Sequence, residues 1–351
     1  MIDTHRLFGI LLTLTITATV PLNCGADGHE AKDGPKAWEK GKGWGWVWGD
    51  DDQVGALNEL DSTSVLAALE LVRKGEVRDL GIDYDRSSYI WPGHSPGEVL
   101  TFRSPEGITR QADHSFVSPE NGNTTLTTWH SCALFMNDNV ATQIDGLAHA
   151  VVGADNHWYN GFKESDWGGD FGVRKAGAET IPPVVARGVL IDVAGYKGVD
   201  ALPSKTVVTV DDLKGALKRQ GTELKFGDVV LIRTGTLRYW GKSGADHVKI
   251  AEHDSAGIQL PAAKWLVEQK GTIMIGSDTS GLEMYQPPPE GSGSFIPVHI
   301  YLLVEQGVHI AEFHYLEDLA AEKVYEFLYI GVTNSIRGAT AGFAMRPLAI
   351  F

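Results

Sequence analysis

Histidine, carboxylate and amide side chains meet in two short segments of this 351-residue chain. The first segment holds Gln143, Asp145 and His149, and the second holds His299 and Glu312. Imidazole nitrogens and carboxylate oxygens are ligands for divalent metal ions, and a histidine can also move protons near neutral pH. These residue types could build a hydrolytic site in which an ion activates water and polarises a carbonyl group.

The spacing of the first segment suggests how its side chains could converge. On a helix, Asp145 and His149 share one face, whereas on a strand Gln143 and Asp145 point the same way. A strand that runs into a helix here would direct all three side chains into one pocket. By spacing alone, however, a helix-capping Asp145 and a hydrogen-bonded core His149 are the favoured interpretation.

Several other polar residues are weaker candidates. His309 and His314 flank Glu312 and could support it or replace a ligand, although packing roles are favoured. Asp278 follows a predicted strand and could hydrogen-bond within a turn. Trp129-His130 could line a pocket or lie on a strand with one buried face.

Hydrophobic patterns predict the elements that must position these residues. Short apolar runs predict buried strands at residues 190–193, 229–233 and 272–275. Helices are expected at residues 62–74 with Gly75 as C-cap, at 210–220 after the capping box Thr209–Asp212, and at 261–268. The Pro-, Gly- and Ser-rich stretch 287–294 predicts a surface loop or lid before His299. Strands and helices alternate over 185–335, which indicates a mixed α/β chain without regular βαβ repeats.

Three tryptophans lie within five residues, at Trp44, Trp46 and Trp48. They could form a hydrophobic edge packed on the core, or an aromatic wall for a planar substrate. The two interpretations are equally supported. We take Trp46 and Trp48 as candidate substrate-binding residues.

The composition is that of an acidic globular protein. The net charge is −15 and 43% of residues are hydrophobic, which is enough for a large core. This charge argues against nucleic acid as a partner, because phosphate binding needs clustered lysine and arginine. Cys24 and Cys132 are too few for a zinc–thiolate site. Cys132 is expected to be a lone buried thiol unless it pairs with Cys24, and no Gly-x-Ser-x-Gly motif marks a serine nucleophile.

The N-terminus carries a pattern typical of a secretory signal. Arg6 precedes an apolar run from Leu7 to Val20, which is too short to span a bilayer as a helix. We expect a signal peptide over 1–24, with weak support for a lipoprotein site at Cys24; the alternative is a buried N-terminal helix. The protein is then exported, periplasmic or secreted. Residues 25–43 are expected to be a flexible lead-in to a domain over 44–351, in which no stretch is apolar enough for a transmembrane span.

The segment 141–149 resembles the signature of the cyclase superfamily, which includes bacterial kynurenine formamidase and isatin hydrolase. Similar motifs occur in the same order along residues 44–345, at 48–58, 159–162, 187–193, 227–235, 276–279 and 297–312. The resemblance implies a single α/β domain of the swivelling β/β/α type, with a mixed sheet and flanking helices. It also implies a homo-oligomer, a dimer or larger.

The resemblance assigns a role to each residue of the two segments. Asp145, His299 and Glu312 match the metal ligands of the family, and His149 matches its catalytic proton-transfer histidine. No serine or cysteine nucleophile is needed in such a site.

Two positions depart from the family pattern. Asn139 and Gln143 stand where the usual signature has metal-binding histidines. An amide offers only a neutral oxygen to a metal. We therefore expect one divalent ion, manganese or zinc, with Gln143 assisting the three matched ligands.

The activity that the resemblance implies is hydrolysis of an amide C–N bond. An arylformamidase-like or isatin hydrolase-like reaction would act on a small aromatic or cyclic amide and would belong to tryptophan catabolism. Lactone or ester hydrolysis on the same site is the closest alternative, followed by a cyclase or lyase reaction. A non-catalytic exported protein that binds a small molecule or metal is the alternative outside enzymes.

Overall fold

The computed structural model of the chain describes residues 37–94, 96–240, 245–284 and 293–351. The expected signal peptide over 1–24, with Cys24, lies outside the described residues, as do most of the lead-in and most of the loop 287–294. The described residues belong to one compact unit. No helix within these ranges is long and apolar enough to cross a membrane.

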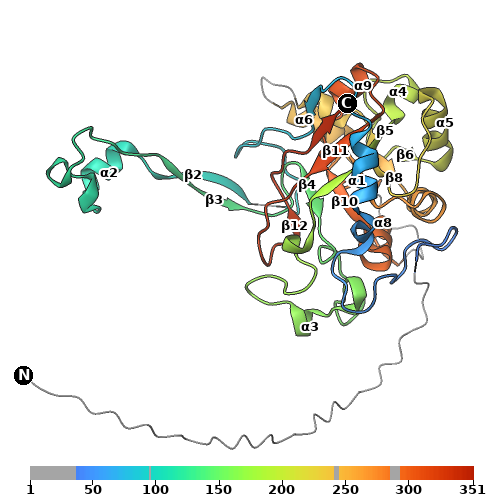
Figure 1. The fold of residues 1–351 in the computed structure, drawn as a ribbon, viewed down its shortest axis with the longest axis horizontal. Coiled ribbons are helices and arrows are strands. Elements are labelled where there is room, and N and C mark those ends of the chain that lie inside the picture. Colours follow the sequence, from blue (N-terminus) through green and yellow to red (C-terminus); the bar gives the residue numbers. More distant parts are fainter. Residues whose placement is uncertain (1–36, 95, 241–244, 285–292) are drawn as a thin grey trace, which may run out of the picture. The chain divides into compact units, whose positions relative to one another are not determined.

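A mixed sheet of nine strands forms the centre of the fold (Figure 1). Its strand order is β1-β13-β11-β5-β7-β9-β10-β4-β12, and β5, β7, β9 and β10 are mutually parallel at its centre. The outer strands join antiparallel on both sides. Its strands are β1 (Val77–Asp79), β4 (Gln143–Asp145), β5 (Val184–Asp192), β7 (Val229–Arg233), β9 (Met274–Ser277), β10 (His309–Glu312), β11 (Glu326–Gly331), β12 (Ala341–Gly342) and β13 (Leu348–Ile350).

Helices flank this sheet, as expected for the α/β fold, and two small sheets accompany it. The helices are α1 (Ser62–Leu69), α3 (Glu164–Trp167), α4 (Val193–Lys197), α5 (Val210–Gln220), α6 (His247–His253), α7 (Leu260–Lys264), α8 (Pro297–His299) and α9 (Glu317–Ala321). A further helix, α2 (Pro105–Gln111), lies away from this sheet (Figure 1). The small sheets pair β6 (Val207–Val208) with β8 (Gly257–Ile258), and β2 (Gly97–Arg103) with β3 (Ser131–Met136). Helices α1 and α5 pack on β5.

Most elements of the second half follow the sequence pattern. The strand expected at 229–233 is β7, and the run 190–193 falls in β5 and the first residue of α4. The strand expected at 272–275 lies two residues later, as β9. The capping box of Thr209 and Asp212 opens α5 as expected. The helix expected at 261–268 begins at Leu260 and continues from Trp265 as a π-helix.

The helix expected at 62–74 is wrong in its C-terminal half. Helix α1 ends at Leu69, and Gly75 lies beyond it in a left-handed turn. Leu66 and Leu69 are exposed, so the apolar stripe that suggested a longer helix has no layer to bury it. The backbone amide of Lys74 instead donates to the carbonyl of the C-terminal residue Phe351, and this pairing replaces further helical hydrogen bonds.

A buried ion network ties the end of β7 to its neighbours. The Arg233 guanidinium lies 2.7 Å from Asp192 Oδ1, and its Nε lies 2.7 Å from Glu317 Oε1. Removing one partner of a buried ion pair leaves the other charge uncompensated. We therefore expect Arg233→Met to lower the free energy of unfolding by about 3–5 kcal/mol, measured by urea denaturation. The exposed Arg219→Met is the control and should stay within about 0.5 kcal/mol of wild type; an equally small effect at Arg233 would contradict this account.

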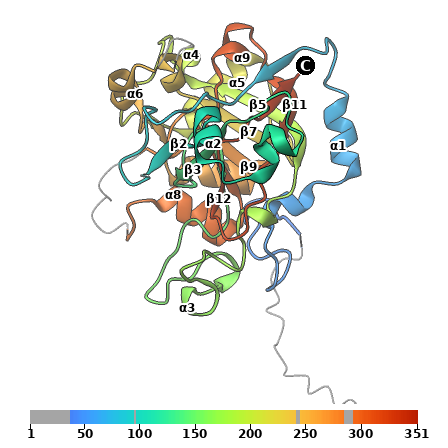
Figure 2. The same ribbon diagram turned by 90° about the vertical axis from the view of Figure 1, so that its left-hand side faces the viewer.

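Strands β2 and β3 form a separate ribbon that projects from the elements around the nine-stranded sheet (Figures 1 and 2). We call residues 97–136, which comprise this ribbon and the turns between its strands, the arm. Cys132 lies on β3 and is exposed. The expectation of a buried thiol is therefore wrong, because no second layer in the described part of the chain covers the ribbon.

Candidate metal centre

The pairing of β4 with β10 gathers three of the predicted site residues. Gln143 is the direct partner of Glu312, and Asp145 lies two residues further along β4. Side chains two residues apart on a strand point to the same face. The Gln143 amide nitrogen accordingly donates to Glu312 Oε2 at 2.8 Å and to Asp145 Oδ1 at 3.2 Å. All three side chains are buried.

His149 reaches the same place through a turn and not through the expected helix. Strand β4 ends at Asp145, and the backbone amide of His149 donates to the Gly146 carbonyl at 3.0 Å. The amide of Gly146 donates to the Thr340 carbonyl, so the chain stays tied to the segment before β12 and cannot coil into a helix. A Cβ at Gly146 would lie 2.6 Å from that carbonyl oxygen, which explains the glycine.

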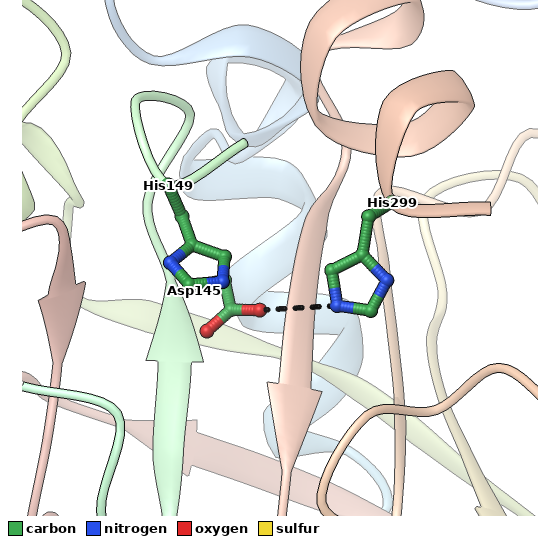
Figure 3. A group of neighbouring side chains, drawn as sticks. All are labelled: Asp145, His149 and His299. Carbon is green, nitrogen blue, oxygen red and sulfur yellow. Dashed lines mark ion pairs between the residues drawn. The ribbon is translucent and has the colours of Figure 1, made fainter. Parts of the chain in front are cut away.

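His299 completes the cluster from α8 (Figure 3). Its Nε2 lies 3.8 Å from Asp145 Oδ2 and 3.6 Å from Glu312 Oε1. Asp145, His149 and His299 each offer one ligand atom, and these atoms lie within 4.8 Å of one another. Residues far apart in the sequence thus form a compact set of nitrogen and oxygen donors.

The electrostatics of this cluster fit a bound cation. Burial raises the pKa of Glu312 well above its usual value, and the neighbouring Asp145 charge raises it further. Asp145 Oδ2 and Gln143 Oε1 are buried without a hydrogen-bond partner. Buried polar atoms normally have partners, and a divalent ion between these groups would satisfy the oxygens and offset the carboxylate charges. The donor set, with both imidazole and carboxylate, suits zinc or manganese.

The two amides that replace the histidines of the family pattern form a short chain. Gln143 Nε2 also donates to Asn139 Oδ1 at 3.1 Å. The amide nitrogen of Gln143 thus faces the carboxylates of Asp145 and Glu312 and orients both. This places Gln143 in contact with the cluster, with its free Oε1 as the one atom that could reach an ion.

The weaker candidates have local structural roles. His309 Nδ1 lies 2.8 Å from the Asp145 carbonyl oxygen and supports the backbone of β4. Burial lowers the pKa of His314 to about 4, so its neutral ring can donate to the Glu312 carbonyl and accept from Tyr329. Asp278 accepts hydrogen bonds from the Thr234 and Gly235 amides and closes a turn.

A cavity of about 220 Å³ opens beside the cluster. It is lined by Trp91, His94, His149, Ser255, Ser280, Gly281, Glu283, Phe295, Ile296, His299 and Glu312. His94 and Trp91 come from the loop before the arm, and sequence reasoning missed both. The His94 ring centroid lies 6.2 Å from that of His149, and burial lowers the pKa of His94. No spacing signal in the sequence connects this loop to His149.

The expected aromatic wall of Trp46 and Trp48 is not at this cavity. Trp46 stacks on Tyr159 at 5.8 Å between ring centroids, and Trp48 stacks on the buried Trp44 at 5.3 Å. Neither residue lines the cavity. Trp48 thus packs on the core through Trp44, which matches the alternative interpretation, whereas Trp46 remains 43% exposed beside Tyr159. Trp91 and Phe295 supply the aromatic lining of the cavity instead. Trp129, the other aromatic candidate, lies on the arm and stacks on Phe116.

Glu283 is a second residue that the sequence did not reveal. Its carboxylate accepts hydrogen bonds from the backbone amides of Val298 and His299 and also contacts His299 Nδ1. This contact leaves Nε2 of His299 facing Asp145 and Glu312. Burial lowers the pKa of His299, but the hydrogen bonds with Glu283 and Glu312 outweigh it, and the pKa lies well above its usual value without an ion.

We expect Glu283→Gln to weaken ion binding by roughly 10- to 100-fold, because partners of this kind fix the orientation of a ligating imidazole. Competition with a chromophoric chelator measures the affinity. Glu268→Gln is the matched control, since Glu268 also accepts a hydrogen bond, from Tyr301, but does not line the cavity. Equal affinities of the two variants would refute the orienting role of Glu283.

The fold and the cluster define a class before any comparison: an α/β protein with a histidine–carboxylate site suited to metal-dependent hydrolase or cyclase chemistry. A family model described as "Putative cyclase" matches residues 48–284. The chain belongs to this cyclase family, as the resemblance implied. A search of curated protein sequences finds no match.

Solved structures agree with this assignment. A structure described as a novel cyclase is 30% identical, with a TM-score of 0.73, and the match covers 88% of this chain and 98% of that one. Isatin hydrolase A from Labrenzia aggregata is 19% identical, with a TM-score of 0.51 over 84% and 98% of the two chains. An isatin hydrolase bound to the product analogue thioisatinate is 18% identical, with a TM-score of 0.54 over 83% and 98%. The isatin hydrolases share the fold of this chain.

Proposed function

We propose that this protein is a metal-dependent hydrolase that cleaves the C–N bond of a small aromatic or cyclic amide. The observation that carries the proposal is the unpartnered, buried Asp145 Oδ2 beside His299 and Glu312, with the half-buried His149 next to it at a cavity. Such a site has donors for one ion, a titratable group and room for a substrate.

We assign different roles to the residues of the cluster. Asp145, His299 and Glu312 would hold one divalent ion, manganese or zinc, while Gln143 and Glu283 orient these ligands. When bound, the ion supplies activated water and polarises the substrate carbonyl. His149 faces the cavity, where its imidazole can accept a proton from the attacking water and return it to the leaving amine.

The cavity supports an aromatic or ring-shaped substrate. A dry cavity of about 150 Å³ holds benzene, so the 220 Å³ here is on the scale of one substituted or fused ring. Trp91 and Phe295 offer planar apolar surface at its wall. The structural similarity to isatin hydrolases adds support for a cyclic amide.

Elemental analysis and a substrate panel test the proposal together. We expect about one manganese or zinc ion per chain, and hydrolysis of N-formylkynurenine or isatin that a chelator abolishes and the ion restores. Product mass identifies the reaction, because hydrolysis adds one water and cyclisation does not. If the protein hydrolysed only lactones, its substrate would be an ester and not an amide. A protein that contained no metal and hydrolysed no substrate of the panel would overturn the proposal and would favour a binding protein.

We also propose that the protein acts after export, as the N-terminal pattern of Arg6 and the following apolar run suggests. Expression in a bacterial host with separate recovery of periplasm and cytoplasm tests this proposal. Intact mass of the exported form would locate the cleavage site. A full-length chain retained in the cytoplasm would contradict the proposal.

A further inference from the structure

The cavity beside the metal centre has acidic side chains in its wall and, among the described residues, no basic one. Glu283 and Glu312 line it, whereas none of its described lining residues is lysine or arginine. Ser95 and residues 285–292 adjoin lining residues in the sequence but lie outside the described ranges, and they contain no lysine or arginine either. Burial lowers the pKa of His94, so its ring is uncharged at neutral pH. The lining therefore offers no lysine or arginine that could pair with a negatively charged group of a substrate.

A further carboxylate lies directly behind this wall. Asp254 is only 2% exposed. It accepts hydrogen bonds from the backbone amide of the lining residue Ser280 at 3.0 Å, from the Ser280 hydroxyl, and from the Tyr89 hydroxyl at 3.1 Å. These donors are neutral and do not balance its negative charge. The charge is felt in the site, because it contributes to the raised pKa of Glu312.

Backbone amides near the cavity are also engaged by carboxylates of the protein. The amides of Val298 and His299 donate to Glu283 at 3.2 and 3.1 Å, and that of Ser280 donates to Asp254. These three amides are therefore not free to hold an anion of a substrate. An anion that leaves water without a cation or several donors to receive it loses its hydration without compensation.

A bound ion does not reverse this balance of charge. The two positive charges of a divalent ion match the carboxylates of its proposed ligands Asp145 and Glu312. The carboxylates of Glu283 and Asp254 then remain as negative charges at the wall. Like charges that share one cavity repel each other, and the net charge of −15 adds a repulsive field outside it.

We propose that this cavity selects amides that carry no carboxylate, so that the substrate is an uncharged ring compound. The inference rests on the proposed function and narrows its substrate class. Selectivity of this kind arises mainly by rejection, since an anionic analogue loses its hydration and finds no partner. An amide such as N-formylkynurenine, which carries a carboxylate, then fits less well than a neutral cyclic amide such as isatin.

Probes that differ in charge but hardly in size test the inference on the metal-loaded protein. Isatin-5-carboxamide and isatin-5-carboxylate form one pair, and 4-formamidobenzamide and 4-formamidobenzoate form the other. After division by the ratio of their hydroxide-catalysed rates, we expect kcat/KM of the uncharged member to exceed that of the anion by roughly tenfold or more. A corrected ratio near one in a pair that the protein hydrolyses overturns the inference and leaves the proposed function intact.

A cation placed in the wall should weaken this preference. Gly281 lines the cavity, and a Cβ at this position would meet no atom within 4 Å, so a longer side chain has room. Relative to the matched neutral variant Gly281→Gln, we expect Gly281→Lys to raise kcat/KM for the anion over that for the uncharged probe by roughly tenfold. Equal ratios in the two folded variants overturn the inference.

Binding of inert compounds decides the matter if no probe is hydrolysed. Indole-5-carboxamide and indole-5-carboxylate contain neither the ring amide nor the formyl group of the probes. Calorimetry on the metal-free protein measures both Kd values without an ion to which the carboxylate could bind, and we expect the carboxamide to bind roughly tenfold or more tightly. In that case the charge selectivity stands although the proposed function fails. Equal Kd values, tighter binding of the carboxylate, or binding of neither compound overturns the inference.

Discussion

Replacing His149 by alanine is expected to lower kcat by about 10²-fold or more while the ion stays bound. The physical reason is the position of the ring. His149 is half-buried and faces the cavity, whereas Asp145, His299 and Glu312 are buried together beneath it. Loss of the imidazole then removes the group that exchanges protons with the substrate and leaves three ligands in place.

Metal content and turnover must be measured on the same sample for this test. The matched control is His157→Ala, because His157 lies in the following loop, pairs with Asp155 and does not line the cavity. Imidazole added to the His149→Ala protein should restore part of the rate, since the cavity left by the ring can accept it. If the His149→Ala protein also lost the ion, His149 would be a metal ligand. The geometry allows this, because its ligand atom lies within 4.8 Å of those of Asp145 and His299. His94, whose ring lies beside that of His149, would then be the candidate for proton transfer.

The spacing of the first segment allowed the local half of this site, although by itself it favoured a helix-capping Asp145 and a hydrogen-bonded core His149, and only the family resemblance reversed that preference. On a strand Gln143 and Asp145 would point the same way, and this segment does form the strand β4. His149 does lie beside Asp145, as a strand followed by a helix would have placed it, but a turn and not a helix brings it to the cavity. These features depend on neighbours in the chain, which a sequence displays directly.

The other half depends on pairing between distant segments. Glu312 is 169 residues from Gln143, and only the register of β4 against β10 places the two side chains together. Glu283 and His94 lie in irregular segments, where no periodicity indicates which way a side chain points. The roles of His299 and Glu312 could be named beforehand from the resemblance alone, and the spacing offered no substitute for it.

The arm shows a different limit. Its strands carry consecutive apolar residues, as buried strands of a sheet do, but in the described part of the chain most of these side chains are exposed. The helix expected at 62–74 failed for a related reason, because Leu66 and Leu69 form an apolar stripe that this chain leaves exposed. A hydrophobic pattern indicates that a surface will be buried, but not by what.

Replacing Asp145 by asparagine is expected to remove the ion and turnover together while the fold remains. Asparagine keeps an oxygen where Gln143 donates, so the hydrogen bond at Oδ1 can persist. It loses the charge that attracts a cation and the anionic Oδ2 that lacks a partner. We expect metal content to fall from about one ion per chain to near zero and hydrolysis to reach background.

The free energy of unfolding of the Asp145→Asn protein gives a sharper test, because the variant should be less stable than wild type only when the ion is present. Without metal, the variant should be at least as stable as wild type. The Asp145 charge lies close to Glu312 and raises the pKa of that buried carboxyl, which means that two negative charges there repel each other. The substitution removes this repulsion. With the ion at about 100 times its Kd, wild type should gain about 2.7 kcal/mol, and the variant should gain nothing. Asp278→Asn is the contrast, because Asp278 is also fully buried but both its oxygens accept hydrogen bonds, so its loss should destabilise the protein with or without metal. If metal-free Asp145→Asn were as unstable as Asp278→Asn, Asp145 would be a structural residue, and the proposed metal centre would lose its central ligand.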